Sequence, residues 1–156
     1  MTGSVNSTWS NWVGNQSCTP DRMLAAGNTD DVVAAVRCAR DAGCTIRTSG
    51  GGHFFSPVVN TDSILLDTSD LNGIVSIDPV AKTITAGAQT VIRDIGAPLL
   101  EAGLALKNQG DINTQTLIGA ISTATHGSGL AFGSFSGELV ACRQNETPAF
   151  PPHPHS

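Results

Sequence analysis

The chain has 156 residues, 40% of them hydrophobic, which is long enough to bury the core of one globular domain. Its formal net charge is -5 and it has no basic run, which argues against a nucleic-acid backbone or an anionic membrane as the main partner. Four cysteines form neither a CxxC pair nor a zinc-ligand spacing, so we expect no metal site and favour a small-molecule ligand.

The start of the chain bears on its location. It has neither the basic start nor the apolar core of a secretory signal peptide, so we expect a cytoplasmic protein. The alternative is a secreted or membrane-associated protein whose N-terminus is incomplete. Three matches to the N-glycosylation acceptor pattern keep that alternative open.

Composition divides the chain into three parts. Residues 1–19 are rich in Ser, Asn, Thr and Gly and hold Trp9 and Trp12, which predicts an irregular lead-in pinned by two aromatic anchors. We place the folded domain at residues 20–143. Residues 144–156 have four prolines and no apolar periodicity, which predicts a disordered tail.

The first elements of the domain predict a βαβ unit. A strand is expected over 22–26, followed by a helix that Thr29 caps and Gly43 ends, and then by a strand over 44–48. The glycines at 50–52 come directly after that second strand. Ligands of α/β sheets bind at such strand ends.

The rest of the domain predicts antiparallel pairing after the parallel unit. We expect a buried strand over 63–67 and a hairpin over 73–87, built around an Asp-Pro turn. An amphipathic helix is expected over 90–103, with Pro98 kinking or shortening it, and one more strand over 135–142.

A glycine-histidine segment is the first that could carry chemistry. Its three glycines can adopt positive φ angles and expose successive backbone N–H groups, which form a concave anion site suited to a pyrophosphate. The segment matches neither a P-loop nor the GxGxxG dinucleotide motif. His53, beside the glycines, is placed to act as nucleophile, acid or base. The alternatives are an ordinary turn and a packed histidine.

The second segment is GDINTQTLIGAISTATHGSG, residues 110–129. Small residues predominate in it and allow close backbone approach, while its hydroxyls can bond phosphate and ribityl oxygens. A threonine-rich surface loop, with His126 as a structural histidine, is the alternative reading. As a pair, the two segments predict two walls of one cofactor cleft. The hydroxyl-bearing residues are Thr114, Thr116, Ser122, Thr123, Thr125 and Ser128.

With these motifs the chain resembles the FAD-binding domain of the vanillyl-alcohol oxidase family, in its sugar-1,4-lactone and alditol oxidase branch. The branch's GSGHSxSP motif reads GGGHFFSP here, and its GDIxxQTxxGAISTxTHGSG motif is matched by the second segment. The resemblance runs from Asn11 to Arg143. It implies an α+β, PCMH-type FAD-binding fold, with a small βαβ subdomain followed by an incomplete mixed or antiparallel sheet with flanking helices.

The resemblance also implies a set of FAD-binding residues, with no catalytic residue and no metal ligand among them. His53 stands where the branch attaches its flavin covalently, through an imidazole nitrogen to the 8α-methyl carbon. Phe54 replaces the usual serine, which removes a hydroxyl that can hold the flavin. The loop positions expected to wrap the pyrophosphate are Ser49, Gly50, Gly51, Gly52 and Phe54. The positions expected to line the flavin are Thr116, Gly119, Ala120, Thr123, Ala124, Thr125, Gly127 and Ser128.

The implied activity is oxidation of a sugar lactone, such as an L-gulono- or D-arabinono-1,4-lactone, or of an alditol. Hydride would pass from the hydroxyl-bearing carbon to FAD, with O2 as acceptor and hydrogen peroxide as product. Relatives in the branch continue into a substrate domain, whereas here Arg143 is followed by the proline-rich tail. We therefore expect a truncated chain with little or no turnover.

Three alternatives stay open. The first is a non-catalytic flavin-binding or remnant module. Another is a berberine-bridge-like oxidase, although no cysteine lies near the second motif to serve as its usual second attachment point. The last is an interaction protein that uses the tail.

Overall fold

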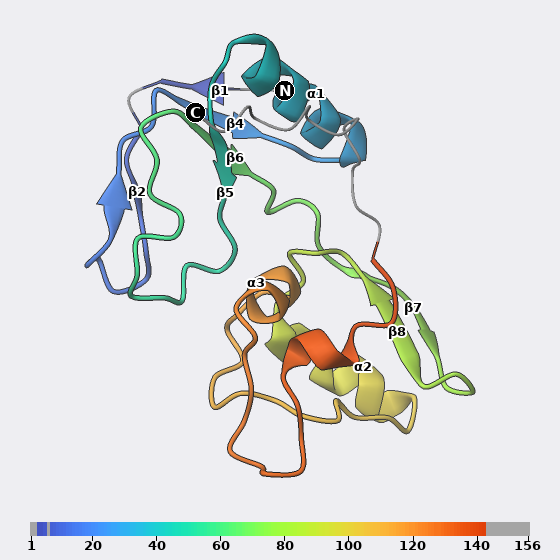
Figure 1. The fold of residues 1–156 in the computed structure, drawn as a ribbon. Coiled ribbons are helices and arrows are strands. Elements are labelled where there is room, and N and C mark those ends of the chain that lie inside the picture. Colours follow the sequence, from blue (N-terminus) through green and yellow to red (C-terminus); the bar gives the residue numbers. More distant parts are fainter. Residues whose placement is uncertain (1–2, 6, 143–156) are drawn as a thin grey trace, which may run out of the picture.

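The computed structural model describes residues 3–5 and 7–142, which form two lobes (Figure 1). The first lobe is a four-stranded mixed sheet with helix α1 (Thr29–Asp41) packed on it, and the second holds an antiparallel hairpin and short helices. The sheet has the order β1-β4-β6-β5. Its strands are β1 (Gly3–Ser4), β4 (Arg22–Ala25), β5 (Ile46–Thr48) and β6 (Ile64–Asp67).

The elements of the predicted βαβ unit are confirmed, because β4, α1 and β5 follow one another as expected. The two strands do not pair with each other, however. Both pair in parallel with β6, which lies between them and is the predicted buried strand. Ile64, Leu65 and Leu66 of β6 are all buried, the continuous apolar run typical of a central parallel strand. The C-terminal ends of β5 and β6 therefore lie at one edge of the sheet.

Helix α1 begins one residue earlier than its predicted cap implies. Asn28, not Thr29, is the N-cap: its backbone is extended and its Oδ1 accepts a hydrogen bond of 2.9 Å from Asp31 N. The prediction was wrong because both residues can cap a helix and the asparagine comes first. The predicted end is confirmed, since Gly43 follows the helix with a φ of +64°. The helix buries Ala35 against the sheet.

A second small hairpin precedes the sheet. It is formed by β2 (Trp9–Ser10) and β3 (Ser17–Cys18), which pair antiparallel and belong to the expected lead-in. The predicted tail at 144–156 lies outside the described residues.

The second lobe begins with the predicted hairpin, which is confirmed as β7 (Ile74–Asp78) and β8 (Thr83–Ala86). Asp78 Oδ1 accepts hydrogen bonds from the backbone N–H groups of Val80 and Ala81, both at 2.9 Å, and so holds the turn. The helical elements that follow are η1 (Ile92–Asp94), α2 (Gly96–Glu101), α3 (Leu117–Ser122) and η2 (Phe135–Glu138). With β7–β8 after the βαβ unit, the expected α+β architecture is confirmed.

The helix predicted over 90–103 is broken into η1 and α2. Pro98 is the reason: it has no N–H, so it is tolerated only in the first turn of a helix, where that donor has no intrahelical partner anyway. The structure places Pro98 at the third position of α2, and the shortening expected from it is confirmed.

The strand predicted over 135–142 is wrong, because this stretch starts as the short helix η2. Phe135 is buried against Ile92 and Ala120, and its backbone N–H donates to Thr125 O at 2.8 Å. Ser136 Oγ donates to Ile121 O at 2.8 Å. The segment is thus hydrogen-bonded to the region around α3 and not to a neighbouring strand.

Over residues 3–5 and 7–142, no helix has the length and apolar composition that a membrane crossing requires.

Candidate functional site

The glycine-histidine loop leaves the C-terminal end of β5, at the sheet edge described above. Gly52 is buried with a φ of +69°, and its carbonyl accepts hydrogen bonds from the N–H groups of Trp12 (3.4 Å) and Phe54 (3.1 Å). The four successive N–H groups of residues 50–53 donate to no acceptor in the described part of the chain. Such a run of free donors is the feature that an anionic ligand needs.

The loop lies against the start of the second motif. A Cβ added to Gly50 would lie 2.7 Å from Thr116 Oγ1, and one added to Gly51 would lie 3.0 Å from the carbonyl oxygen of Thr114. Both distances are shorter than ordinary van der Waals contact, so a side chain at position 50 would overlap Thr116, and one at position 51 would need the Thr114 carbonyl to move by a few tenths of an ångström. The prediction that the two motifs come together is confirmed for this portion of the second motif.

Gln89 joins the loop to the rest of the sheet edge and was missed by the sequence analysis. Its buried Nε2 donates to Ser49 O at 2.9 Å and to Thr68 Oγ1 at 2.6 Å, while Thr68 Oγ1 lies 3.2 Å from Thr48 Oγ1. One amide of the second lobe therefore fixes the ends of β5 and β6. No sequence motif marked Gln89, because its role depends on contacts with residues about 20 and 40 positions away in the chain.

The second motif is built around α3. Thr116 is the N-cap of this helix, and its Oγ1 accepts from Gly119 N at 3.3 Å. Thr123 Oγ1 donates to Gly119 O at 2.9 Å, and Gln115 Nε2 donates to Thr125 Oγ1 at 3.2 Å. Three of the expected ligand-binding hydroxyls thus have a structural partner within the motif, although each can still make a further hydrogen bond.

The last part of the motif packs on a different segment. A Cβ on Gly127 would lie 2.5 Å from Gln109 O, and one on Gly110 would lie 2.9 Å from Thr125 Cγ2. These glycines therefore also allow close packing of residues 108–110 on residues 125–127. His126 is exposed, and its Nδ1 is 2.9 Å from Gly127 O. Ala124 has a φ of 51°, while Ala120 is a fully buried residue of α3 that packs with Ile92 and Phe135.

His53 and Phe54 contact the N-terminal hairpin. The His53 imidazole stacks on the Trp12 indole, with ring centroids 5.1 Å apart and planes inclined by 22°. Neither ring nitrogen of His53 has a hydrogen-bond partner within the described ranges. Phe54 stacks on Trp9 at 5.7 Å and 7°. The phenylalanine that replaces the usual serine at position 54 is therefore held by packing on an aromatic ring.

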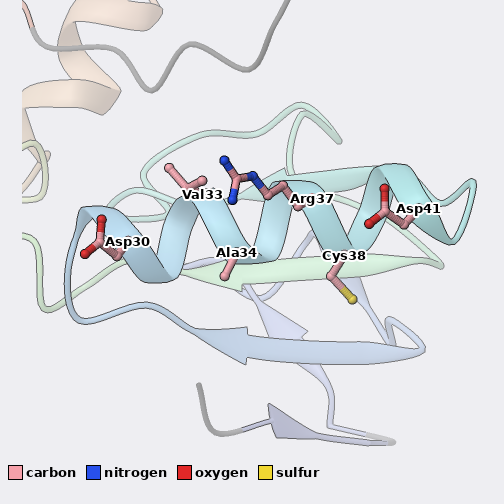
Figure 2. A pocket seen from close by; sticks show the side chains of 6 residues that line it. All are labelled: Asp30, Val33, Ala34, Arg37, Cys38 and Asp41. Carbon is pink, nitrogen blue, oxygen red and sulfur yellow. The ribbon is translucent and has the colours of Figure 1, made fainter.

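These observations fit a bound diphosphate and a flanking planar ring system. The free N–H groups suit the diphosphate, whereas Gln115 Oε1, a buried acceptor for which the described residues supply no donor, suits an N–H or O–H group of a ligand. Two hollows lie elsewhere. Figure 2 shows one along α1, and all its lining residues belong to that helix: Asp30, Val33, Ala34, Arg37, Cys38 and Asp41. The other is lined by Cys18, Thr19, Asn60, Thr61 and Asp62.

Comparison with known proteins gives a consistent result. A family model described as "FAD binding domain" matches residues 20–142. The L-gulono-1,4-lactone dehydrogenase of Mycobacterium tuberculosis is 32% identical over 135 residues, covering 86% of this chain and 32% of that protein. The D-arabinono-1,4-lactone oxidase of Kluyveromyces lactis is 34% identical over 139 residues, covering 86% of this chain and 26% of that protein.

Solved structures agree with the sequence matches. Cholesterol oxidase from Brevibacterium sterolicum superimposes with a TM-score of 0.70 and 26% identity, over 83% of this chain and 25% of that one. The chain thus spans about a third or less of the length of the relatives that it matches.

Proposed function

The chain belongs to the FAD-binding domain family, and we propose that it forms the flavin-binding part of an oxidoreductase that acts on a sugar-1,4-lactone. The expected PCMH-type fold and the FAD cofactor follow from that membership and from the solved neighbours. The observation that carries the proposal is the contact of Gly50 and Gly51 with Thr114 and Thr116, beside four free N–H groups. An alditol is the second substrate class.

The loop Ser49–Phe54 has the role of holding the diphosphate. Its free N–H groups donate to the phosphate oxygens, and the missing side chains at 50 and 51 let the backbone come close enough to do so. FAD supplies the hydride acceptor when it is bound. The residues proposed to line its ring system are Thr116, Gly119, Ala120, Thr123, Ala124, Thr125, Gly127 and Ser128.

His53 has the role of covalent attachment. A ring nitrogen of His53 would give up its proton and hold a bound flavin by a bond to its 8α-methyl carbon, which would give up one hydrogen. The bound flavin would supply the acceptor for the two electrons released by this bond, and dioxygen would take them up with the two protons as hydrogen peroxide. The absence of any partner for the His53 nitrogens within the described ranges supports this role, because either nitrogen is available to form the bond.

The substrate and the final electron acceptor belong to the whole protein. Two relatives act by name on 1,4-lactones, and one is called a dehydrogenase whereas the other is called an oxidase. We propose dioxygen as the acceptor. In this proposal, residues 1–156 alone bind flavin but do not oxidise a lactone. The reason is that they correspond to about a third of the relatives' length. A remnant that has lost flavin binding is the alternative.

We also propose that the FAD-binding domain covers residues 20–143, with 1–19 as lead-in and 144–156 as tail. A cytoplasmic location is proposed as well. All four cysteines (Cys18, Cys38, Cys44 and Cys142) are free thiols, which fits a reducing compartment. Cell fractionation with a tagged full chain tests the location.

Calorimetric titration of the purified full chain with FAD, FMN and riboflavin tests the flavin site. We expect FAD to bind at least about tenfold more tightly than riboflavin, because only FAD fills the diphosphate cradle; tenfold corresponds to about 1.4 kcal/mol. Gly51→Ala should remove most of this preference. Gly96→Ala, whose Cβ meets open space, should leave it unchanged. Equal affinities of the wild type for FAD and riboflavin would contradict the cradle, and no binding at all would favour the remnant.

A further inference from the structure

The residues on each side of His53 are held by the segment that follows β2 in the N-terminal hairpin. Trp12 N–H donates to Gly52 O at 3.4 Å, and Asn11 Nδ2 donates to Phe54 O at 2.7 Å. The two carbonyls that flank His53 in the sequence are therefore both fixed by one short segment. The position of the His53 backbone depends on residues about 40 positions earlier in the chain.

Asn11 makes this segment rigid. It is 5% exposed, and its Nδ2 also donates to Asn15 Oδ1 at 2.7 Å, while its Oδ1 accepts from Gln16 N at 3.1 Å. Its backbone N–H donates to Gln16 O at 2.9 Å. The side chain amide thus uses both of its donors and its acceptor, a fully satisfied network of the kind that specifies one arrangement. These hydrogen bonds also fix the backbone from which the side chain of Trp12, the next residue, extends.

The Trp12 side chain is not there to fill a core, because it is 57% exposed. Its indole lies on one face of the His53 imidazole, and the Phe55 ring meets it edge-on, with centroids 6.2 Å apart and planes at 67°. The indole therefore covers a face of the imidazole and leaves the ring edge, where both nitrogens lie, without a partner in the part of the chain described. A new bond to a ring nitrogen forms along its in-plane lone pair, so the plane of the ring sets the direction of attack.

We propose that Trp12 is a positioning residue for flavin attachment, which holds the plane of the His53 imidazole so that a nitrogen at its edge faces the 8α carbon. The proposal rests on the covalent role given to His53 above. Trp9 provides a matched control. It lies on the same hairpin and stacks on the neighbouring ring, Phe54, whereas the imidazole stacks on Trp12.

The test is a time course of covalent flavin incorporation. The full chain, prepared without flavin, is mixed with excess FAD, and the fraction carrying the mass of FAD less two hydrogens is measured by intact-protein mass spectrometry. We expect Trp12→Leu to slow attachment roughly three- to tenfold, the fold-change that corresponds to loss of one aromatic pair. Trp12→Phe should restore most of the rate, and Trp9→Leu should change it less than about twofold.

A second readout separates orientation from affinity. In a His53→Ala background, where attachment is blocked, Trp12→Leu should leave the FAD dissociation constant unchanged. In the wild type, the His53 ring protons should show an upfield ring-current shift in NMR spectra that Trp12→Leu abolishes. Trp12→Met takes the place of the leucine variant if that variant does not fold.

Each outcome decides between the parts of the proposal. Attachment in the wild type at the same rate as in Trp12→Leu would overturn the role of Trp12 and leave the role of His53 intact. An equal slowing by Trp9→Leu would also overturn it, because the effect would then be a general loosening of the hairpin. No attachment in the wild type would overturn the covalent role of His53, and the role of Trp12 with it.

Discussion

A Cβ on Gly50 would lie 2.7 Å from the Oγ1 of Thr116, so the backbone of the first motif approaches the cap of helix α3 as closely as a glycine allows. Thr116 Oγ1 is occupied by its hydrogen bond from Gly119 N and cannot turn away without uncapping the helix. The contact joins the two lobes at the point where the proposed diphosphate site lies.

Gly50→Ala should therefore destabilise the protein by about 1–3 kcal/mol, the usual cost of overpacking. Urea unfolding followed by circular dichroism measures this. Thr116→Ala alone should cost about 1 kcal/mol through loss of the cap. In the double variant the overlap is relieved, so its loss of stability should be smaller than the sum of the two single losses by at least about 0.5 kcal/mol. If the two stability losses were strictly additive, the contact between Gly50 and Thr116 would be less close than in the structure.

Gln89 gives a second prediction. Gln89→Leu removes a buried donor from Ser49 O and Thr68 Oγ1. We expect a loss of about 1–3 kcal/mol in the free energy of unfolding and a weaker affinity for FAD, because the start of the glycine loop is no longer held. Gln109→Leu is the matched control at an exposed glutamine and should stay within about 0.5 kcal/mol of wild type. Equal effects of the two substitutions would refute the bridging role of Gln89.

The helix cap can be tested by a pair of neighbouring substitutions. Asn28→Ala should lower the free energy of unfolding by about 1 kcal/mol, because it leaves the N–H of Asp31 without its acceptor. Thr29→Ala, inside the first turn, should have a much smaller effect. Thermal unfolding of both variants measures the difference, and a larger loss for Thr29→Ala would favour the cap originally predicted from the sequence.

Much of the fold could be predicted from local patterns in both lobes. The acidic first turn and Gly43 marked α1, the apolar run Ile64–Leu66 marked a buried strand, and Asp78 marked the turn of the β7–β8 hairpin. These signals are local because capping, burial and turn chemistry depend on a few adjacent residues. The insertion of β6 between β4 and β5 has no such local signal and was found only in the structure.

The site was predictable in its motifs but not in its support. The glycines and hydroxyls stood out in the sequence, whereas Gln89, Asn11 and the stacking of Trp12 on His53 depend on contacts between distant segments. The strand expected at 135–142 failed for a similar reason. Phe135 is apolar enough for a strand, yet its burial under α3 and its hydrogen bond to Thr125 O favour a helical turn.

The measurement that tests the central claim most directly is the intact mass and in-gel flavin fluorescence of the denatured full chain, for wild type, His53→Ala and His126→Ala. His126 is the control because it is an exposed histidine of the second motif, with a backbone partner for its Nδ1. We predict a fluorescent band and the added mass of FAD less two hydrogens in wild type and His126→Ala, and neither in His53→Ala. Added flavin mass that survives in His53→Ala, or that is missing from the wild type, would contradict the assignment of His53 as the attachment point.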